Sequence, residues 1–254
     1  MSARATADLV HYLLMRYREH SAGAALDRWV ECVWWIEGGE PVSGHPVRPD
    51  GCIDILYSTE GGLQVVGAMT SERRFDLAAG ARTIGVRFRP GMAPAFLRTP
   101  AAELTDRTIP LEAFWGRAAR ELESRVAEAV SPGQALVNAL RPPGESPNAV
   151  QLAIEALTAS HGEARVEWAA REAGMSERQF RRRCLEESGL APKQLCRVLR
   201  FRRACSLGEG GLPWGLVAVE AGYFDQAHLI RDFREFTGGT PVSVFSNTGD
   251  GRAG

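Results

Sequence analysis

Two copies of one sequence pattern lie 49 residues apart in the C-terminal part of the chain. The first copy runs from Trp168 to Cys184, and the second runs from Val217 to Phe233. Each copy predicts a short helix, a glycine turn, a capping residue and a second helix. This order is typical of a helix-turn-helix, which places its second helix in the major groove of DNA. Two such units in tandem would read two successive faces of the groove without a partner chain.

The residues at the turns support this prediction. Gly174 and Gly222 lie where each first helix must end, and glycine adopts the left-handed conformation without a Cβ clash. Ser176 and Asp225 are favourable N-caps for the helices that follow. In each second helix an apolar pair four residues apart is expected to face the core: Phe180 with Cys184, and Leu229 with Phe233.

Further motifs surround the two copies: Ser188–Pro192, the basic segment Arg197–Ala204, Phe224–Gln226, Phe233 and Phe236–Pro241. In this order they resemble the DNA-binding domain of AraC/XylS-type transcription regulators, over about residues 149–245. The resemblance implies that a long helix, here residues 193–205, joins the two units. Two departures stand out. Cys184 replaces the family's usual phenylalanine, and the glycine-rich Gly208–Gly211 predicts a loose joint between the units.

The resemblance also implies which side chains face DNA. They are Arg178, Gln179, Arg181 and Arg182 in the first unit, and Gln226, Ala227, His228, Ile230 and Arg231 in the second. The arginines of the first unit suit guanine O6 and N7. Ala227 and Ile230 offer only apolar contacts, for example with thymine methyl groups. His228 is expected to lie nearer the DNA backbone.

The net charge of −1 does not by itself indicate nucleic acid, but its distribution does. Residues 177–203 contain nine basic and three acidic side chains, whereas residues 204–245 contain two basic and five acidic ones. Binding to phosphates with release of counterions requires such a basic patch. We therefore expect phosphate contacts from the first unit and the linker helix. The alternative is a solvated helix face.

The N-terminal half predicts a sheet. Residues 29–36, 52–57, 63–67 and 83–88 are rich in β-branched and aromatic residues or alternate in polarity, as strands do. Short helices are predicted at 93–98, 112–129 and 133–140, and a proline-rich linker at 141–147.

The chain therefore divides into four predicted segments. They are a β-rich ligand-sensing domain at 1–110, connecting helices and a linker at 111–148, the DNA-binding domain at 149–245 and a disordered tail at 246–254. The fold class is α+β: a small β-rich, cupin-like sensor domain with connecting helices, then an all-α domain of two helix-turn-helix units.

Several motifs of the N-terminal half carry a second resemblance: Pro49–Asp54, Val66–Gly67, Gly85–Gly91, Leu104–Asp106 and Phe114–Gly116. They look like the N-terminal domain of an actinobacterial-type subgroup of AraC regulators, which is similar to the cupin-like sensor domains of the family. This resemblance implies sensing or dimerisation, and it identifies no ligand.

The candidate effector-binding residues are Trp34, Arg48, Asp50, Asp54, Arg87 and Arg89. Alternation places Arg87 and Arg89 on one face of a strand, where they could bind an anionic effector. The alternative is that one of them pairs with Asp50 or Asp54 and holds two strands together. Trp34 and its neighbour at position 35 point to opposite faces, so at most one lines a cavity.

We predict no metal site, no cofactor and no enzymatic activity. His45 is the only histidine near the two aspartates, whereas a cupin metal site needs several. Cys32 and Cys52 could form a thiol or metal sensor, although buried inert thiols are the expected reading. The alkyl-accepting domain that some AraC-type proteins carry needs four zinc-binding cysteines, and this half has two. The sequence contains no GxSxG, P-loop or HExxH motif.

Together these features predict a bacterial transcription regulator that binds double-stranded DNA and responds to a small effector. The alternative is a DNA binder without an effector, whose N-terminal domain serves only dimerisation or autoinhibition. A homodimer and contact with RNA polymerase are further expected partners. The sequence lacks a run of ~20 apolar residues and a signal-peptide pattern, so we expect a cytoplasmic, nucleoid-associated protein without membrane contact.

Overall fold

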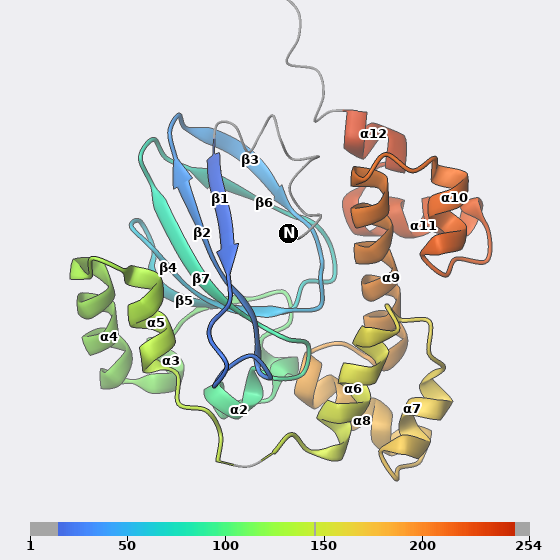
Figure 1. Cartoon of the computed structure of the whole chain (residues 1–254), viewed down its shortest axis with the longest axis horizontal. Coiled ribbons are helices and arrows are strands. Elements are labelled where there is room, and N and C mark those ends of the chain that lie inside the picture. The colour runs from blue at the N-terminus through green and yellow to red at the C-terminus, as the bar shows by residue number, and fades with distance from the viewer. Residues whose placement is uncertain (1–14, 145, 247–254) are drawn as a thin grey trace, which may run out of the picture.

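The computed structural model describes residues 15–144 and 146–246. Figure 1 shows a β-sheet part and a helical part that lie side by side. The first 14 residues of the predicted sensor domain and, beyond Ser246, the predicted disordered tail lie outside the described residues. Within the described ranges, no helix is long and apolar enough to cross a membrane.

The main sheet is antiparallel, in the order β1-β2-β7-β4-β5-β8, and β3 pairs with β6 in a separate ribbon. The strands are β1 Met15–His20, β2 Val30–Gly38, β3 Val42–Val47, β4 Ile53–Ser58, β5 Gly62–Val66, β6 Arg73–Leu77, β7 Arg82–Phe88 and β8 Thr108–Pro110. The four predicted strands are confirmed as β2, β4, β5 and β7. The sequence did not predict the other four. Among these, β3 contains Gly44 and Pro46, which weaken a strand signal.

Alternation along the strands gives the main sheet two different faces. On one face Val33, Ile55 and Val86 are buried. Helices α4 (Arg117–Glu128) and α5 (Pro132–Ala139) cover this face, and Gly133 of α5 lies against Val33. The opposite face carries polar side chains and looks toward the helical part.

The short helices of the N-terminal part largely follow the prediction. Helix α2 (Pro94–Leu97) is followed by the short helical turn η1 (Ala101–Glu103). The helix predicted at 112–129 is divided into α3 (Glu112–Trp115) and α4. The break occurs at Gly116, whose φ of 53° interrupts the right-handed helix.

The helical part comprises α6 Ala149–Ala159, α7 Val166–Glu172, α8 Glu177–Ser188, α9 Pro192–Glu209, α10 Trp214–Glu220, α11 Gln226–Thr237 and α12 Pro241–Ser246. Both predicted helix-turn-helix units are present, as α7–α8 and α10–α11. Ser176 and Asp225 cap α8 and α11 through side-chain oxygens. Gly174 and Gly222 have φ of 67° and 74°. The predicted apolar pairs are fully buried: Phe180 with Cys184, and Leu229 with Phe233.

Helix α9 carries both units and is longer than the predicted 193–205. Phe201 of α9 packs against Phe233 and Phe236 of α11, with ring centroids 4.9 and 5.0 Å apart. A Cβ atom on Gly208 would lie 2.3 Å from Trp214 Cη2 of α10. Close packing therefore explains the glycine at position 208, where we had expected a loose joint.

Two hydrogen bonds join the sheet part to the helical part. Thr105 Oγ1 donates a hydrogen bond to the Gly189 carbonyl at 2.7 Å. Near the other end of α9, the Glu72 backbone N–H donates to the Phe236 carbonyl at 2.6 Å. Each contact joins the N-terminal part to one helix-turn-helix unit.

Candidate DNA-binding surface and ligand cavity

Helix α8 presents the first predicted recognition surface to solvent. Arg178, Arg181 and Arg182 are exposed, opposite the buried side of the helix. Arg182 pairs with Glu186 only at 3.8 Å, and such exposed pairs hold a side chain weakly. Gln179 is also exposed, but its Oε1 accepts a hydrogen bond from the backbone of the N-cap residue at 3.0 Å. The three arginines are therefore available as donors, whereas Gln179 belongs to the cap.

Helix α11 offers a less basic surface. Of the predicted residues, three are exposed: Gln226, Ala227 and Arg231. Ile230 is half-buried and packs against the core. The His228 ring lies edge-on against Tyr223, with centroids 5.2 Å apart. Gln226 and Arg231 therefore hold most of the hydrogen-bonding capacity of this face.

Three arginines of α9, Arg197, Arg200 and Arg202, make ion pairs or hydrogen bonds within the protein. Arg197 Nη2 lies 2.7 Å from Asp232 Oδ1. Arg200 donates to a backbone carbonyl at 2.8 Å, and Arg202 pairs with Glu31 of β2. The phosphate contacts expected from the linker helix stay a prediction, and these three residues are already engaged within the protein. Three exposed arginines lie on α8, whereas the exposed basic residue of α9 is Lys193.

A cavity of about 1010 Å³ lies between the polar face of the main sheet and α9. The sheet contributes alternate residues of β1, β2, β4, β5 and β7, and α9 contributes Leu199 and Arg202 among others. All six candidate effector residues line it: Trp34, Arg48, Asp50, Asp54, Arg87 and Arg89. Its volume is large enough for a small organic molecule.

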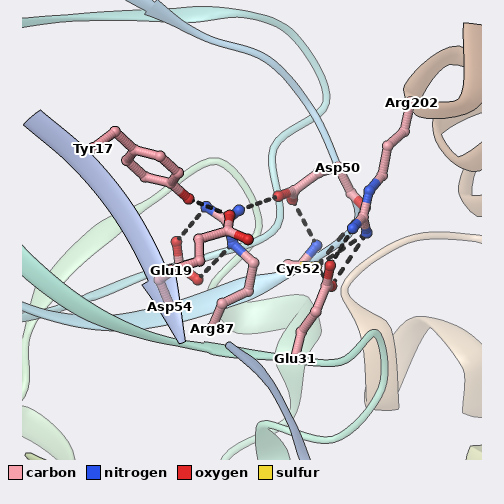
Figure 2. Close-up of polar contacts among 8 residues, drawn as sticks. All are labelled: Tyr17, Glu19, Glu31, Asp50, Cys52, Asp54, Arg87 and Arg202. Atoms are coloured by element: carbon pink, nitrogen blue, oxygen red, sulfur yellow. Dashed lines mark hydrogen bonds and ion pairs between the residues drawn. The ribbon is translucent and has the colours of Figure 1, made fainter. Parts of the chain in front are cut away.

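Arg87 stands at the centre of a buried ionic cluster, shown in Figure 2. Its Nε and Nη2 each donate to Asp54 at 3.2 Å, and its Nη1 lies 3.4 Å from Asp50. The guanidinium thus joins β7 to β4 and to the turn before it. Burial raises the pKa of Asp54 to about 6, against the opposing effect of Arg87. The Arg87 guanidinium already binds the carboxylates of Asp50 and Asp54, so an anionic ligand would compete with them for Arg87.

A second ion pair connects the cavity to α9 (Figure 2). Arg202 of α9 pairs with both carboxylate oxygens of Glu31. The Cys52 thiol lies 3.3 Å from Glu31 and 3.8 Å from Arg202. Sequence reasoning missed this pair. A carboxylate inside the apolar strand segment 29–36 was the available signal, but nothing in the sequence identifies its partner 171 residues away.

The remaining two candidate arginines are held by the protein at the edges of the cavity. Arg48 Nη1 lies 3.6 Å from Glu209 of α9, and its guanidinium stands 4.7 Å over the Phe245 ring. Arg89 is exposed, and its Nε donates to the Asp27 carbonyl at 2.9 Å. Arg87 and Arg89 therefore do not act together as an anion-binding pair.

The two cysteines of the N-terminal half have the character of inert thiols. Both are buried. Burial raises the pKa of Cys32 to about 12 and that of Cys52 well above its ordinary value, so both remain protonated at neutral pH. Among the described residues, no three His, Cys, Asp or Glu side chains gather as a metal site.

Asp54 gives a pH-dependent contribution to stability. Its pKa of about 6 in the folded chain lies above its ordinary value of 3.8. The folded state therefore binds this proton more tightly than the unfolded state, and the resulting stability is lost as the pH rises through 6. As the pH is lowered from 7 to 5, we expect the free energy of unfolding of the wild type to rise relative to that of Asp54→Asn. Urea denaturation measures both values. A constant or falling difference would contradict the assignment.

Two family models match the chain. Residues 18–110 match a domain described as "Domain of unknown function (DUF6597)", and residues 169–247 match one described as "Helix-turn-helix domain". No curated protein matches the chain.

Solved structures of regulators are similar to the chain in part. ToxT from Vibrio cholerae is 13% identical over 86% of this chain and 97% of its own, with a TM-score of 0.42. A DNA-binding transcriptional dual regulator from Escherichia coli K-12 is 26% identical over 41% of this chain and 94% of its own, with a TM-score of 0.35. CdpR from Pseudomonas aeruginosa is 20% identical over 67% and 47%, with a TM-score of 0.34.

The class of the protein follows from the matched domain and the two units described above. The chain carries a C-terminal helix-turn-helix domain of the AraC type, preceded by a β-rich DUF6597 domain. The helix-turn-helix domain confirms the resemblance to AraC-type regulators that was inferred from the motifs of the C-terminal part.

Proposed function

We propose that the chain is a sequence-specific transcription regulator whose DNA affinity is set by a small effector bound in the cavity. One observation carries this proposal. The helix that holds both DNA-binding units, α9, also forms a wall of the cavity through Leu199 and Arg202. A molecule that binds there contacts the sheet and α9 together, so it can favour one arrangement of the two units over another.

Specificity is assigned to the exposed faces of α8 and α11. Arginine pairs bidentately with guanine O6 and N7, so Arg178, Arg181 and Arg182 are the principal base-reading residues. Gln226 and Arg231 supply the polar contacts of the second unit. Ala227 supplies an apolar contact, and His228 and Ile230 support the helix from its half-buried side. A selection from randomised DNA at a stated salt concentration tests the assignment, because a sequence-specific regulator enriches a motif.

Arg182→Ala is expected to weaken binding to the selected site by roughly 1–3 kcal/mol and to relax the preference at one base position. The reason is the loss of a bidentate contact to one base. Competition titrations against singly substituted sites measure both effects. Arg117→Ala, which removes an exposed arginine of α4, is the matched control and should leave binding unchanged. An equal loss on every DNA sequence would show that Arg182 contacts only phosphate.

A second candidate function uses the N-terminal part for autoinhibition or dimerisation without an effector. The interface contacts of Thr105 and Glu72 with the helix-turn-helix units favour autoinhibition, because they hold the units against the sheet. The two functions differ in their response to small molecules. Only an effector-controlled regulator changes its DNA affinity when a compound fills the cavity.

A further inference from the structure

In the ionic cluster of the cavity, carboxylates outnumber guanidinium groups. Arg87 binds two carboxylates, Asp50 and Asp54, whereas Arg202 is matched by Glu31. Asp50 and Asp54 together therefore carry one more negative charge than the guanidinium that binds them. Both side chains are mostly buried, with 20% and 14% of their surfaces exposed, so water screens this excess poorly. A positive charge brought into the cavity would be stabilised there.

Trp34 offers a second, independent feature of the same cavity. Its indole lies against Gly85 of β7, where a Cβ atom would come within 2.4 Å of the ring. The side chain is 6% exposed and lines the cavity. Its Nε1 donor has no hydrogen-bond partner in the described part of the chain. Buried donors nearly always have an acceptor, so an acceptor supplied by a ligand would complete this site.

We propose that the cavity binds a small organic cation, an amine or guanidine that also carries a hydrogen-bond acceptor. The cationic group lies beside Asp50 and Asp54, and the acceptor receives the Trp34 Nε1 hydrogen. Leu56, Val66 and the Tyr17 ring provide apolar surface for the carbon skeleton. This inference rests on the proposed function, because we take this cation to be the effector that controls DNA affinity.

The same contacts disfavour an anionic ligand. Arg87 and Arg202 are both occupied by carboxylates, as Figure 2 shows. An anion in this position would meet the Asp50 and Asp54 side chains and would have to displace one of them from Arg87. The charge of the ligand is therefore the property that the cavity selects.

Matched compounds that share a carbon skeleton and end in a cationic, a neutral or an anionic group test the proposal. One set is tyramine, tyrosol and 4-hydroxyphenylacetate, and a smaller set is ethanolamine, ethylene glycol and glycolate. Calorimetry with the full chain at pH 7.5 should show at least one amine binding about ten-fold or more tightly than its neutral and anionic counterparts, as a charge-assisted hydrogen bond implies. Tighter binding of a neutral or anionic member would overturn the proposal, and so would the absence of binding by either amine at millimolar concentration.

Two variants assign the binding to these residues. Asp54→Asn should weaken amine binding about ten-fold or more, whereas Glu60→Gln, at the exposed rim of the cavity, should leave it unchanged. Trp34→Phe keeps an aromatic ring and removes the buried donor, so the chain should fold normally and bind the amine roughly five-fold more weakly. An amine that binds Asp54→Asn and Trp34→Phe as tightly as the wild type lies elsewhere.

DNA binding measured with the same compounds separates this inference from the proposed function. If an amine binds in the cavity and DNA affinity stays constant, the cation site stands and the effector role falls. If instead a neutral or anionic compound changes DNA affinity, the effector role stands and the cation proposal falls.

Discussion

Replacing Arg197 with alanine is expected to lower the free energy of unfolding of the helical part by about 3–5 kcal/mol. Arg197 of α9 contacts Asp232 of α11 through Nη2 at 2.7 Å and through Nε at 3.2 Å. The Asp232 side chain is only 3% exposed. Removing the guanidinium leaves a buried carboxylate without its counter-charge, and this cost exceeds the value of an exposed ion pair.

The consequence for function is local to the second unit. Arg197 also donates a hydrogen bond to Glu235, and its guanidinium lies 5.2 Å over the Phe236 ring. These contacts hold α11 in position against α9. Urea denaturation and DNA titration measure the two effects. Arg197→Lys, which keeps the charge but not the fork geometry, should fall between the wild type and the alanine variant. Arg234→Ala, an exposed arginine of α11, should change stability by no more than about 0.5 kcal/mol. Equal stabilities of Arg197→Ala and Arg234→Ala would contradict this account.

Glu31→Ala is expected to destabilise the chain by about 3 kcal/mol and to loosen the contact between the sheet and α9. The variant leaves the Arg202 guanidinium mostly buried, with 24% of its side chain exposed, beside the uncharged Cys52 thiol. Removing both charges should cost much less, because no buried charge is then left uncompensated. The double variant Glu31→Ala with Arg202→Met should therefore recover most of the lost stability.

The double variant also tests how the two parts communicate. The Glu31–Arg202 ion pair links the cavity wall to α9. Loss of this ion pair should therefore remove the effect of a bound ligand on DNA affinity, while DNA binding itself remains. A single variant as stable as the wild type would show that the pair contributes nothing to the interface. A double variant that still responds to ligand as the wild type does would assign the coupling to other contacts.

The helical part follows from local sequence signals. The caps Ser176 and Asp225 and the turn glycines Gly174 and Gly222 act within a few residues, so their structural consequences can be read from the chain. The buried apolar faces of α8 and α11 follow from spacing in the same way. Gly208 shows the limit of such reasoning, because its contact with the Trp214 ring depends on how α9 meets α10.

The cavity depends on contacts distant in sequence. Alternation placed Arg87 on the strand face opposite Val86 and Phe88, and it left open whether Arg87 would pair with an aspartate or face a ligand. The fold decides this, because β4 lies beside β7 with Asp54 opposite Arg87. The Glu31–Arg202 pair joins residues 171 positions apart and cannot be predicted from a single sequence.

The central proposal is that α9 joins the two DNA-reading units so that, in the DNA-bound state, both engage one site with a set spacing between its half-sites. The most direct measurement is the affinity of the full chain for its selected site with and without five base pairs inserted between the half-sites. Five base pairs are about half a helical turn, so the second groove then faces away from the second unit. The account predicts that affinity falls to that of a single half-site. Undiminished affinity after the insertion would contradict it.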